Sequence, residues 1–341
     1  MSNSTFSPRD LRHDEGVAYD VIAVGNALVD VIASRDDEFI AGMQMEKGAM
    51  SLIDADRALH IYGALEGAVQ MSGGSAANTM AGFASFGGKA AFIGKVADDA
   101  LGDVFGHDLH AIGVDFVRPF GGDSLPTGRC MIVVTPDAQR TMNTFLGVSS
   151  LLLPGDIKEE AIKAAAVVYL EGYLFDRDEA KHAFRIAANH AHAAGRQVAL
   201  TLSDAFCVDR HRADFRRLIA DEVDVLFGNE AELLSLYETD TFEFAVAELR
   251  RECTVAAITR SEHGSVVVTP DAVLSVPAKP VEQVIDTTGA GDLYAAGFLY
   301  GYTRGLSLET CAELGHIASA EVISHVGPRP LTELSSLIPA L

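Results

Sequence analysis

The stretch Asp286-Thr-Thr-Gly-Ala-Gly-Asp-Leu-Tyr-Ala-Ala-Gly297 joins a strand-like run that ends at Ile285 to an apolar, helix-forming segment that continues through Tyr302. Its Gly-rich turn brings backbone N–H groups together at the start of a helix, where unpaired donors and the helix dipole favour an anion. Gly289 and Gly291 allow a positive φ and a close approach of a phosphate to the backbone. The stretch therefore predicts a strand, an anion-binding turn and a helix, which together are a unit of an α/β fold.

Asp292 places a carboxylate in the first turn of that helix, beside the predicted anion site. Because a carboxylate repels a phosphate, we interpret Asp292 as a general base that takes a proton from a hydroxyl as a phosphoryl group arrives. A single Asp at the start of a helix more commonly interacts only with the helix terminus. The sequence leaves that structural alternative open.

Apolar runs of strand length alternate with helix-period segments along most of the chain. The strand-like runs include 20–24, 165–170, 197–201 and 223–227, and the amphipathic segments include 177–194 and 208–220. Runs this apolar are covered on both faces of a sheet. Their alternation with helices is typical of a parallel sheet with right-handed crossovers. We therefore expect residues 19–341 to form an α/β domain, a doubly wound and mostly parallel sheet covered by helices.

Two regions, about 31–53 and 116–147, break this alternation. Short alternating runs such as 127–134 and 140–145 are divided there by turn residues. We expect them to form a small antiparallel β lid over a cleft, discontinuous in sequence. The alternative is a pair of edge hairpins without a function. The polar residues 1–18 are expected to be a disordered tail.

The composition is that of a globular protein: 341 residues, 48% hydrophobic and 22% charged. Lys and Arg number 26 against 48 Asp and Glu, a formal net charge of −22. We expect no nucleic-acid partner, because this charge would repel a phosphate backbone. No window approaches the roughly 18 apolar residues of a membrane span, and no apolar leader is visible. We therefore expect no membrane partner and a cytoplasmic location.

The cysteines are far apart in the sequence. They are Cys130, Cys207, Cys253 and Cys311. Structural zinc sites and redox motifs need close cysteine pairs, which this spacing does not supply. We expect buried thiols in a reducing compartment.

Several separated motifs resemble those of the ribokinase-like (PfkB-type) sugar and nucleoside kinases. Asp286–Gly297 resembles the family's C-terminal signature, and Asn229-Glu-Ala-Glu232 its N-x-x-E motif. Gly73-Gly-Ser-Ala-Ala-Asn78 and the segment 94–102 resemble its Gly-rich motifs nearer the N-terminus. The resemblance extends over nearly the whole chain from about Tyr19. Motifs in the right order are more specific than any one of them, and no P-loop pattern competes.

The resemblance implies roles in phosphoryl transfer. Asp292 would be the base, the N–H groups of Gly289, Ala290 and Gly291 would stabilise the transferring group, and Arg140 would reach it from the lid. ATP and Mg²⁺ would lie near Asn229, Glu232, Thr259, Gly264, Thr288 and His316, with Glu232 holding Mg²⁺ through water and Asp286 beside a K⁺ ion that many members bind. Ser261 replaces the first Gly of the family's T-x-G-x-x-G turn, so that turn is expected to differ in shape. Arg140 as a surface charge and Glu232 as a solvated acid are the structural alternatives.

Within the family, the details are most similar to the kinases that phosphorylate adenosine. By that resemblance the ribose hydroxyls would be bound by Asn26, Asp30, Gly74 and Asn78, and the purine by an apolar clamp of Leu28, Met50, Phe145 and Tyr173. Apolar residues of this kind are more often part of a core than of a ligand site. Asn78 has its own alternative, a local backbone cap.

These features together predict an ATP-dependent kinase that acts on the 5′-hydroxyl of a nucleoside, with adenosine as the best fit. A sugar kinase acting on ribose or a ketohexose such as fructose is the first alternative, because the ribose-binding residues serve either acceptor. A non-catalytic nucleotide-binding regulator is a second alternative, disfavoured because the base, both glycines and the N-x-x-E pair are all present. A monomer and a homodimer are both compatible with a lid sheet.

Overall fold

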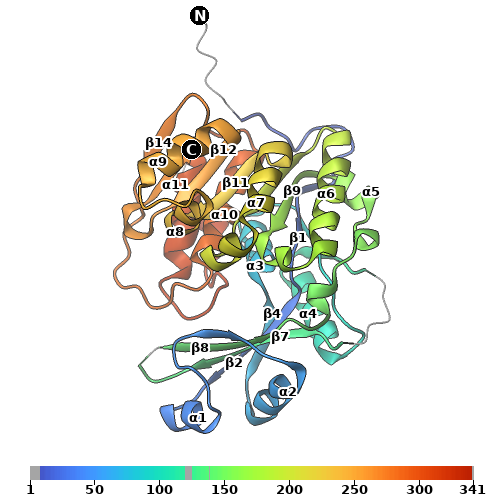
Figure 1. Ribbon diagram of the computed structural model, residues 1–341, viewed down its shortest axis with the longest axis vertical. Helices are drawn as coiled ribbons and strands as arrows, with labels where there is room; N and C mark the ends of the chain where they lie inside the picture. Colours follow the sequence, from blue (N-terminus) through green and yellow to red (C-terminus); the bar gives the residue numbers. More distant parts are fainter. Residues whose placement is uncertain (1–7, 120–124, 138, 340–341) are drawn as a thin grey trace, which may run out of the picture.

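A computed structural model of the protein describes residues 8–119, 125–137 and 139–339, which form a large helix-covered sheet and a smaller sheet (Figure 1). Within these residues the large sheet has nine strands, in the order β14-β13-β12-β11-β10-β9-β1-β5-β6. They are β1 (Tyr19–Val24), β5 (Ala90–Ile93), β6 (Val114–Val117), β9 (Ala165–Glu171), β10 (Gln197–Thr201), β11 (Val225–Asn229), β12 (Val255–Thr259), β13 (Ser265–Val268) and β14 (Val273–Val276). All neighbouring strands from β6 to β12 pair in parallel. The two remaining pairs of this sheet, β12–β13 and β13–β14, are antiparallel. The predicted α/β fold with a mostly parallel sheet is confirmed.

Side chains of the central strands alternate between two hydrophobic cores. On β1, Val21 and Ala23 face one core, and Ile22 and Val24 face the other. The first core is covered by α3 (Ser75–Ser85), α4 (Ala100–Ala111), α10 (Ala290–Thr303) and α11 (Leu308–Val322), and the second by α5 (Glu159–Lys163), α6 (Asp178–Ala193), α7 (Ala205–Glu222), α8 (Glu230–Leu236) and α9 (Phe242–Glu252). Because both faces are covered, these strands are continuously apolar in the sequence.

The small sheet has the strand order β3-β8-β7-β2-β4. Its strands are β2 (Leu28–Ser34), β3 (Met50–Leu52), β4 (Val69–Gly73), β7 (Gly128–Val134) and β8 (Arg140–Phe145). The predicted antiparallel sheet is in fact mixed, since β2 pairs in parallel with β7 and β3 with β8. The chain crosses into the large sheet between β2 and β7, and such a long connection allows parallel pairing, whereas the short β7–β8 turn gives an antiparallel pair.

The predicted boundaries of the small sheet also differ from the observed ones. Residues 116–117 belong to β6 in the large sheet, and residues 120–124 and 138 lie outside the described residues. β4 was not predicted, because it is a short, partly exposed edge strand whose apolar–polar alternation covers only Val69 to Ser72. Below the sheet in Figure 1 lie α1 (Asp37–Gly42) and α2 (Ala55–Ala64), and α2 packs on β7 and β8. Short 3₁₀ helices are η1 (Gly147–Leu151), η2 (Pro154–Asp156), η3 (Gly172–Asp176), η4 (Ser261–His263) and η5 (Leu334–Leu337).

The predicted disordered tail is wrong for residues 8–18, which run from the end of α10 to the start of β9, where the Ala18 N–H donates to the Ala164 carbonyl at 2.8 Å. Leu11 is buried and its N–H donates to the Thr303 carbonyl at 2.9 Å, while Asp10 forms a β-bridge with Arg304. Residues 1–7 lie outside the described part of the chain. The polar composition of this segment concealed its apolar residues Leu11 and Val17, which pack against the hydrophobic core. Among the described helices, none has the length and apolar character needed to cross a membrane.

Candidate active site

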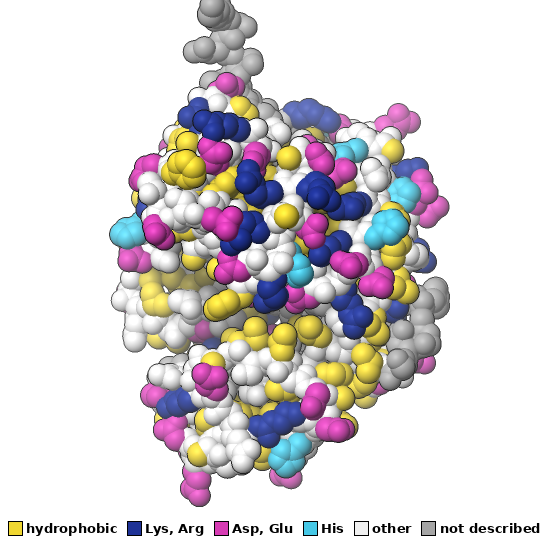
Figure 2. Space-filling model, viewed as in Figure 1, with side chains coloured by type: hydrophobic (Ala, Val, Ile, Leu, Met, Phe, Trp, Pro, Cys, Tyr) yellow, Lys and Arg dark blue, Asp and Glu magenta, His cyan; other side chains and the backbone are white. Residues whose placement is uncertain are grey.

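A cleft of about 690 Å³ lies between the large sheet and the small sheet, and it is visible as the hollow between the two bodies in Figure 2. Its floor follows the carboxyl ends of neighbouring strands. Glu171, Thr201, Asn229 and Thr259 are the last residues of β9, β10, β11 and β12, and all line the cleft. The carboxyl ends of parallel strands meet at one edge of a sheet, where open α/β folds bind ligands. The volume lies in the usual range for small-molecule sites, about 300–1,000 Å³.

The predicted anion turn forms one end of the cleft, where Thr288, Gly289, Ala290 and Gly291 all line it. Gly289 has φ +79°, and a Cβ there would lie 2.9 Å from Pro328, so this position requires glycine. Gly291 lacks a positive φ, contrary to expectation, because it already belongs to the first turn of α10. A Cβ on Gly291 would meet no atom within 4 Å, so the residue leaves open space at the helix start.

The Ala290 N–H, predicted as a phosphate donor, instead donates to the Thr287 carbonyl at 3.2 Å. The hydrogen bonds of the described residues leave the N–H groups of Gly291 and Asp292 without a protein acceptor. Two unpaired donors at the N-terminus of a 14-residue helix, facing open space, fit an anionic group such as a phosphate.

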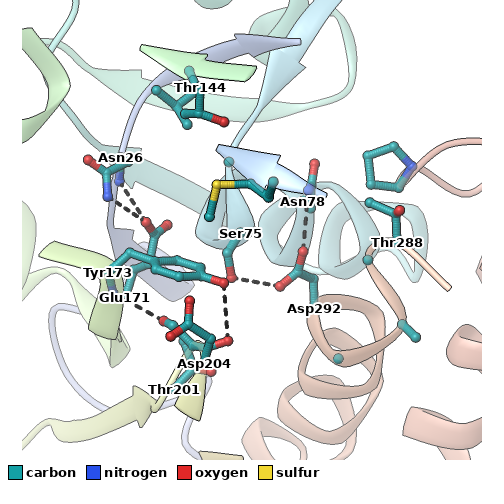
Figure 3. A pocket seen from close by; sticks show the side chains of 18 of the residues that line it. Asn26, Ser75, Asn78, Thr144, Glu171, Tyr173, Thr201, Asp204, Thr288 and Asp292 are labelled. Carbon is teal, nitrogen blue, oxygen red and sulfur yellow. Dashed lines mark hydrogen bonds between the residues drawn. The ribbon is translucent and has the colours of Figure 1, made fainter. Parts of the chain in front are cut away.

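Asp292 lies at the base of this turn and faces the cleft (Figure 3). Its carboxylate accepts hydrogen bonds from Ser75 Oγ at 2.6 Å and from Asn78 Nδ2 at 3.3 Å, both on α3. Burial raises the pKa of Asp292 to about 6, although both hydrogen bonds and the nearby Arg329 act in the opposite direction. A carboxylate with a pKa near neutrality is suited to accept a proton at physiological pH.

The predicted acceptor-binding residues Asn26, Asp30, Gly74 and Asn78 come together at the other end of the cleft. Gly74 has φ +93°, and a Cβ there would lie 2.4 Å from the Asn26 carbonyl oxygen. Asp30 is buried, and burial raises its pKa to about 6. The four residues come from β2, its preceding turn and the start of α3, so the predicted convergence is observed.

Glu171 organises this end of the cleft, a role that the sequence did not reveal. Its carboxylate accepts from Asn26 Nδ2 at 2.8 Å and from the Ala76 N–H at 2.9 Å, so it joins β9 to the β1–β2 turn and the start of α3 (Figure 3). Burial raises its pKa to about 7, although these hydrogen bonds lower it. Its place as the last residue of a buried strand was the available signal.

The small sheet supplies an apolar wall. Residues on this wall include Leu28, Met50, Cys130, Ile132, Met142 and Thr144. Phe145, predicted for the purine clamp, does not line the cleft and is part of a hydrophobic core, where Arg129 lies 5.9 Å from its ring centre. Side chains alternate along a strand, so a face that carries Met142 and Thr144 excludes Phe145. Cys130, like the other three cysteines, is buried and forms no disulfide.

Tyr173 lines the cleft on the side of the large sheet. Its hydroxyl donates to the Ser203 carbonyl at 3.2 Å, and its N–H donates to Ser203 Oγ at 3.1 Å. The ring is therefore held from both ends of the residue. Asp204 and Phe206 line the same wall, and neither was predicted although both follow the carboxyl end of β10.

Asn229 and Glu232 form a reciprocal cap at the start of α8. The Asn229 side chain accepts from the Glu232 N–H at 2.9 Å, and Glu232 accepts from the Asn229 N–H at 3.0 Å. Burial raises the pKa of Glu232 to about 7. Both residues also line the cleft. Because the Glu232 side chain is buried, the alternative that it is a solvent-exposed helix acid is wrong.

Arg140 lies beside the anion turn and forms an ion pair with Asp286. Its Nε and Nη2 are buried and have no hydrogen-bond partner. Asp286 also accepts from the Gly327 N–H at 2.9 Å and from Thr288 Oγ1 at 2.7 Å. Burial raises the pKa of Asp286, but these hydrogen bonds and Arg140 outweigh burial and hold it below its ordinary value. The small sheet is thus tied to the turn, and Arg140 is not the surface charge that was the alternative.

His316 and Gly264, predicted near ATP, do not line the cleft. His316 is buried, with its Nε2 2.9 Å from Ser265 Oγ, and Tyr294 lies between this pair and the cleft, donating to the same hydroxyl at 2.8 Å. Burial lowers the pKa of His316. Gly264 shapes the turn before β13, since a Cβ there would lie 2.1 Å from the Val276 carbonyl oxygen.

Ser261, which replaces a glycine of the family pattern, adopts φ +50°. The left-handed region costs a residue other than glycine about 1–2 kcal/mol. The turn therefore keeps a glycine-like backbone conformation at this position, at some cost in stability.

The sequence model of the family described as "pfkB family carbohydrate kinase" matches residues 61–334. The chain belongs to the PfkB family. Among solved structures, this PfkB chain is 52% identical to adenosine kinase from Sinorhizobium meliloti, with a TM-score of 0.85 over 94% of this chain and 98% of that one. It is 48% identical to a probable sugar kinase from Rhizobium etli CFN 42, with a TM-score of 0.86 and the same coverage. Adenosine kinase from Saccharomyces cerevisiae is 26% identical over 335 residues, 90% of this chain and 96% of that protein.

Membership of the PfkB family confirms the predicted class of enzyme. The protein is a kinase that transfers phosphate to a hydroxyl of a nucleoside or sugar, so its substrates are small molecules. Members use ATP with a metal ion, typically Mg²⁺. In this chain, the open start of α10 at Gly291 fits a bound phosphate. The carboxylate of Glu232, which also lines the cleft, fits the metal ion.

Proposed function

We propose that this PfkB kinase transfers the γ-phosphoryl group of ATP to the 5′-hydroxyl of adenosine, giving AMP and ADP. The observation that carries the proposal is the composition of the acceptor end of the cleft. Polar Asn26, Asp30 and Asn78 lie beside an apolar wall that includes Leu28 and Ile132. Ribose alone would occupy the polar part, whereas a purine needs the apolar wall as well. The 52% identity to the adenosine kinase of S. meliloti supports the same acceptor.

The reaction requires a proton acceptor next to a phosphate site, and Asp292, beside the Gly291 N–H, would take that role. As the 5′-oxygen forms its bond to the γ-phosphorus, the bond from phosphorus to the β-phosphate oxygen breaks and the hydroxyl proton passes to Asp292. The N–H groups of Gly291 and Asp292 would hold the transferring group. Arg140, predicted to reach the transferring group from the small sheet, is instead paired with Asp286 and does not line the cleft.

Asn229 and Glu232 would hold Mg²⁺ through water molecules. A bound Mg²⁺ would neutralise charge on the β- and γ-phosphates. Among the described residues, no three His, Cys, Asp or Glu side chains gather as a metal site. Mg²⁺ usually keeps several waters and binds one or two carboxylates together with substrate phosphates. Closure of the small sheet over the cleft would exclude water, which otherwise competes as the acceptor.

A sugar kinase is the second candidate, because the polar residues that would bind ribose in adenosine would also bind a free sugar. The probable sugar kinase from R. etli, 48% identical, favours it. The two candidates differ in whether the apolar wall contributes to acceptor binding.

The test is a phosphorylation screen with ATP, Mg²⁺ and one acceptor at a time: adenosine, inosine, guanosine, ribose or fructose. ADP release is measured with and without acceptor, and the phosphorylated product is identified by mass. The expected result is the highest kcat/KM with adenosine and a product with the mass of AMP. A preference for ribose or fructose over every nucleoside would overturn the proposal and favour the sugar kinase.

A further inference from the structure

The loop that follows α11 carries an arginine, Arg329, that reaches the candidate active site from the C-terminal end of the chain. Both ends of the loop are pinned. The Gly327 N–H donates to Asp286 at 2.9 Å, and the N–H groups of Leu331 and Thr332 donate to Glu321 at 2.9 and 2.7 Å. The loop is therefore held on either side of Arg329.

Arg329 contacts the first turn of α3 and the end of β4. Its Nε donates to Asn78 Oδ1 at 2.9 Å, and its Nη2 donates to Ser72 Oγ at 2.9 Å. Asn78 in turn donates through Nδ2 to Asp292. An amide has its donor and its acceptor on opposite sides, so a cation that binds the oxygen directs the NH₂ group the other way. Here that direction is toward Asp292.

We propose that Arg329 is a positioning residue for phosphoryl transfer, which holds the Asn78 amide so that its NH₂ group faces the carboxylate of Asp292. The proposal rests on the proposed role of Asp292 as the base. Without Arg329 the amide is free to rotate. Only the weak 3.3 Å bond to Asp292 would then orient it, and a swing of the Asn78 side chain would cost the carboxylate one of its two donors.

The charges around Asp292 give Arg329 a second effect. Acidic neighbours approach from other elements: Asp30 on β2, Glu171 on β9 and Glu232 on α8. Arg140 on β8 forms an ion pair with Asp286, whereas Arg329 is a cation that lowers the pKa of Asp292. Burial lowers the pKa of Arg329 itself, and Asp108, Asp30 and Asp292 oppose that change. Arg329 therefore favours the ionised, proton-accepting form of Asp292.

The test compares Arg329→Gln with wild type in the pH dependence of kcat. The expected result is a kcat lower by about tenfold or more on the plateau, because a misplaced catalytic group is costly. We also expect the acidic limb of the pH dependence of kcat to move to higher pH, because Arg329 favours the ionised form of Asp292. In a double-mutant cycle, Arg329→Gln should have less effect on kcat when Asn78 is already Ala. The proposal would be overturned if the acidic limb of the pH dependence of kcat did not move and the effects of the Arg329 and Asn78 substitutions on kcat were additive. Arg329 would then have only a structural role.

Three further variants make the result specific. Arg329→Lys keeps the charge but loses the planar fork, so its acidic limb should stay near that of wild type while kcat still falls. It also serves if Arg329→Gln does not fold, and wild-type kcat in Arg329→Lys would contradict the positioning role. Arg304→Gln is the matched control, since Arg304 is a partly buried arginine paired with Asp20 at 3.2 Å, and it should change thermal stability without moving the acidic limb. Asp292→Asn is measured in parallel. If that variant keeps its activity, the base assignment fails, an outcome distinct from failure of the Arg329 proposal.

Discussion

Ser75 Oγ donates to the carboxylate of Asp292 at 2.6 Å, across 217 residues of chain. This bond joins the first turn of α3 to the first turn of α10, the helix whose start forms the predicted anion site. Both helices begin at a glycine with a positive φ, Gly74 and Gly289. The proposed proton acceptor is therefore shared between the acceptor end and the phosphate end of the cleft.

Asp292→Asn should lower kcat by at least about 10²-fold, because a general base typically contributes about 10²- to 10⁴-fold. Asn can still accept a hydrogen bond from Ser75 but does not accept the proton. Binding of ATP, measured by calorimetry without acceptor, should change little. Ser75→Ala is the control, because it removes the neighbouring hydroxyl and keeps the carboxylate. A kcat near wild type in Asp292→Asn would remove the base assignment.

The pH dependence of stability should differ between wild type and Asp292→Asn. Burial raises the folded-state pKa of Asp292 from 3.8 to about 6. A raised carboxyl pKa contributes stability that is fully present below pH about 4 and is lost as the pH rises through about 6. The Asn variant carries no such charge, so its melting temperature should exceed that of wild type at pH 8. The difference should shrink as the pH falls to 5. A difference that is constant with pH would mean that Asp292 ionises in the folded protein as it does in the unfolded chain.

Glu232→Gln should shift the Mg²⁺ requirement of the reaction to higher concentration, by about tenfold if the carboxylate orders metal-bound waters. A glutamine at this position can still accept from the Asn229 N–H, so the reciprocal cap of α8 is kept and little change in stability is expected. Ser307→Ala is the control, since Ser307 caps α11 through the Thr310 N–H. It should lower the melting temperature without altering the Mg²⁺ titration. An unchanged titration in Glu232→Gln would restrict that residue to its capping role.

Tyr173→Ala should raise the KM for adenosine by about tenfold or more, if the ring stacks on a purine. Alanine substitution at stacking sites for single-stranded nucleic acids costs roughly 1–3 kcal/mol per base. Any activity on free ribose should change little, because Asp30 and Asn78 are unaltered. Tyr173→Phe keeps the ring and loses only the bond to the Ser203 carbonyl, so its KM should stay near that of wild type. Equal losses on both acceptors, with a lower melting temperature, would assign the ring to the core.

Local sequence determined much of the phosphate end of the cleft. The turn Thr288–Gly291, the carboxylate of Asp292 and the reciprocal cap of Asn229 and Glu232 each depend on residues only a few positions apart. Helix starts follow short-range rules of backbone donors and conformation, so these features could be predicted. The apolar strands of the large sheet were predictable for a similar reason, because burial on both faces makes them continuous in the sequence.

Only the tertiary structure decided which residues face the cleft and which lie behind it. Phe145 and Thr144 are adjacent in sequence, yet only Thr144 lines the cleft, because the pairing of the small sheet decides which of its faces is turned inward. His316 lies behind Tyr294 for a comparable reason, the packing of α10 against α11. Glu171 and Arg329 reach their partners across 95 and 251 residues of chain. Contacts of that range depend on how separate elements pack, and no local pattern of propensity or spacing records them.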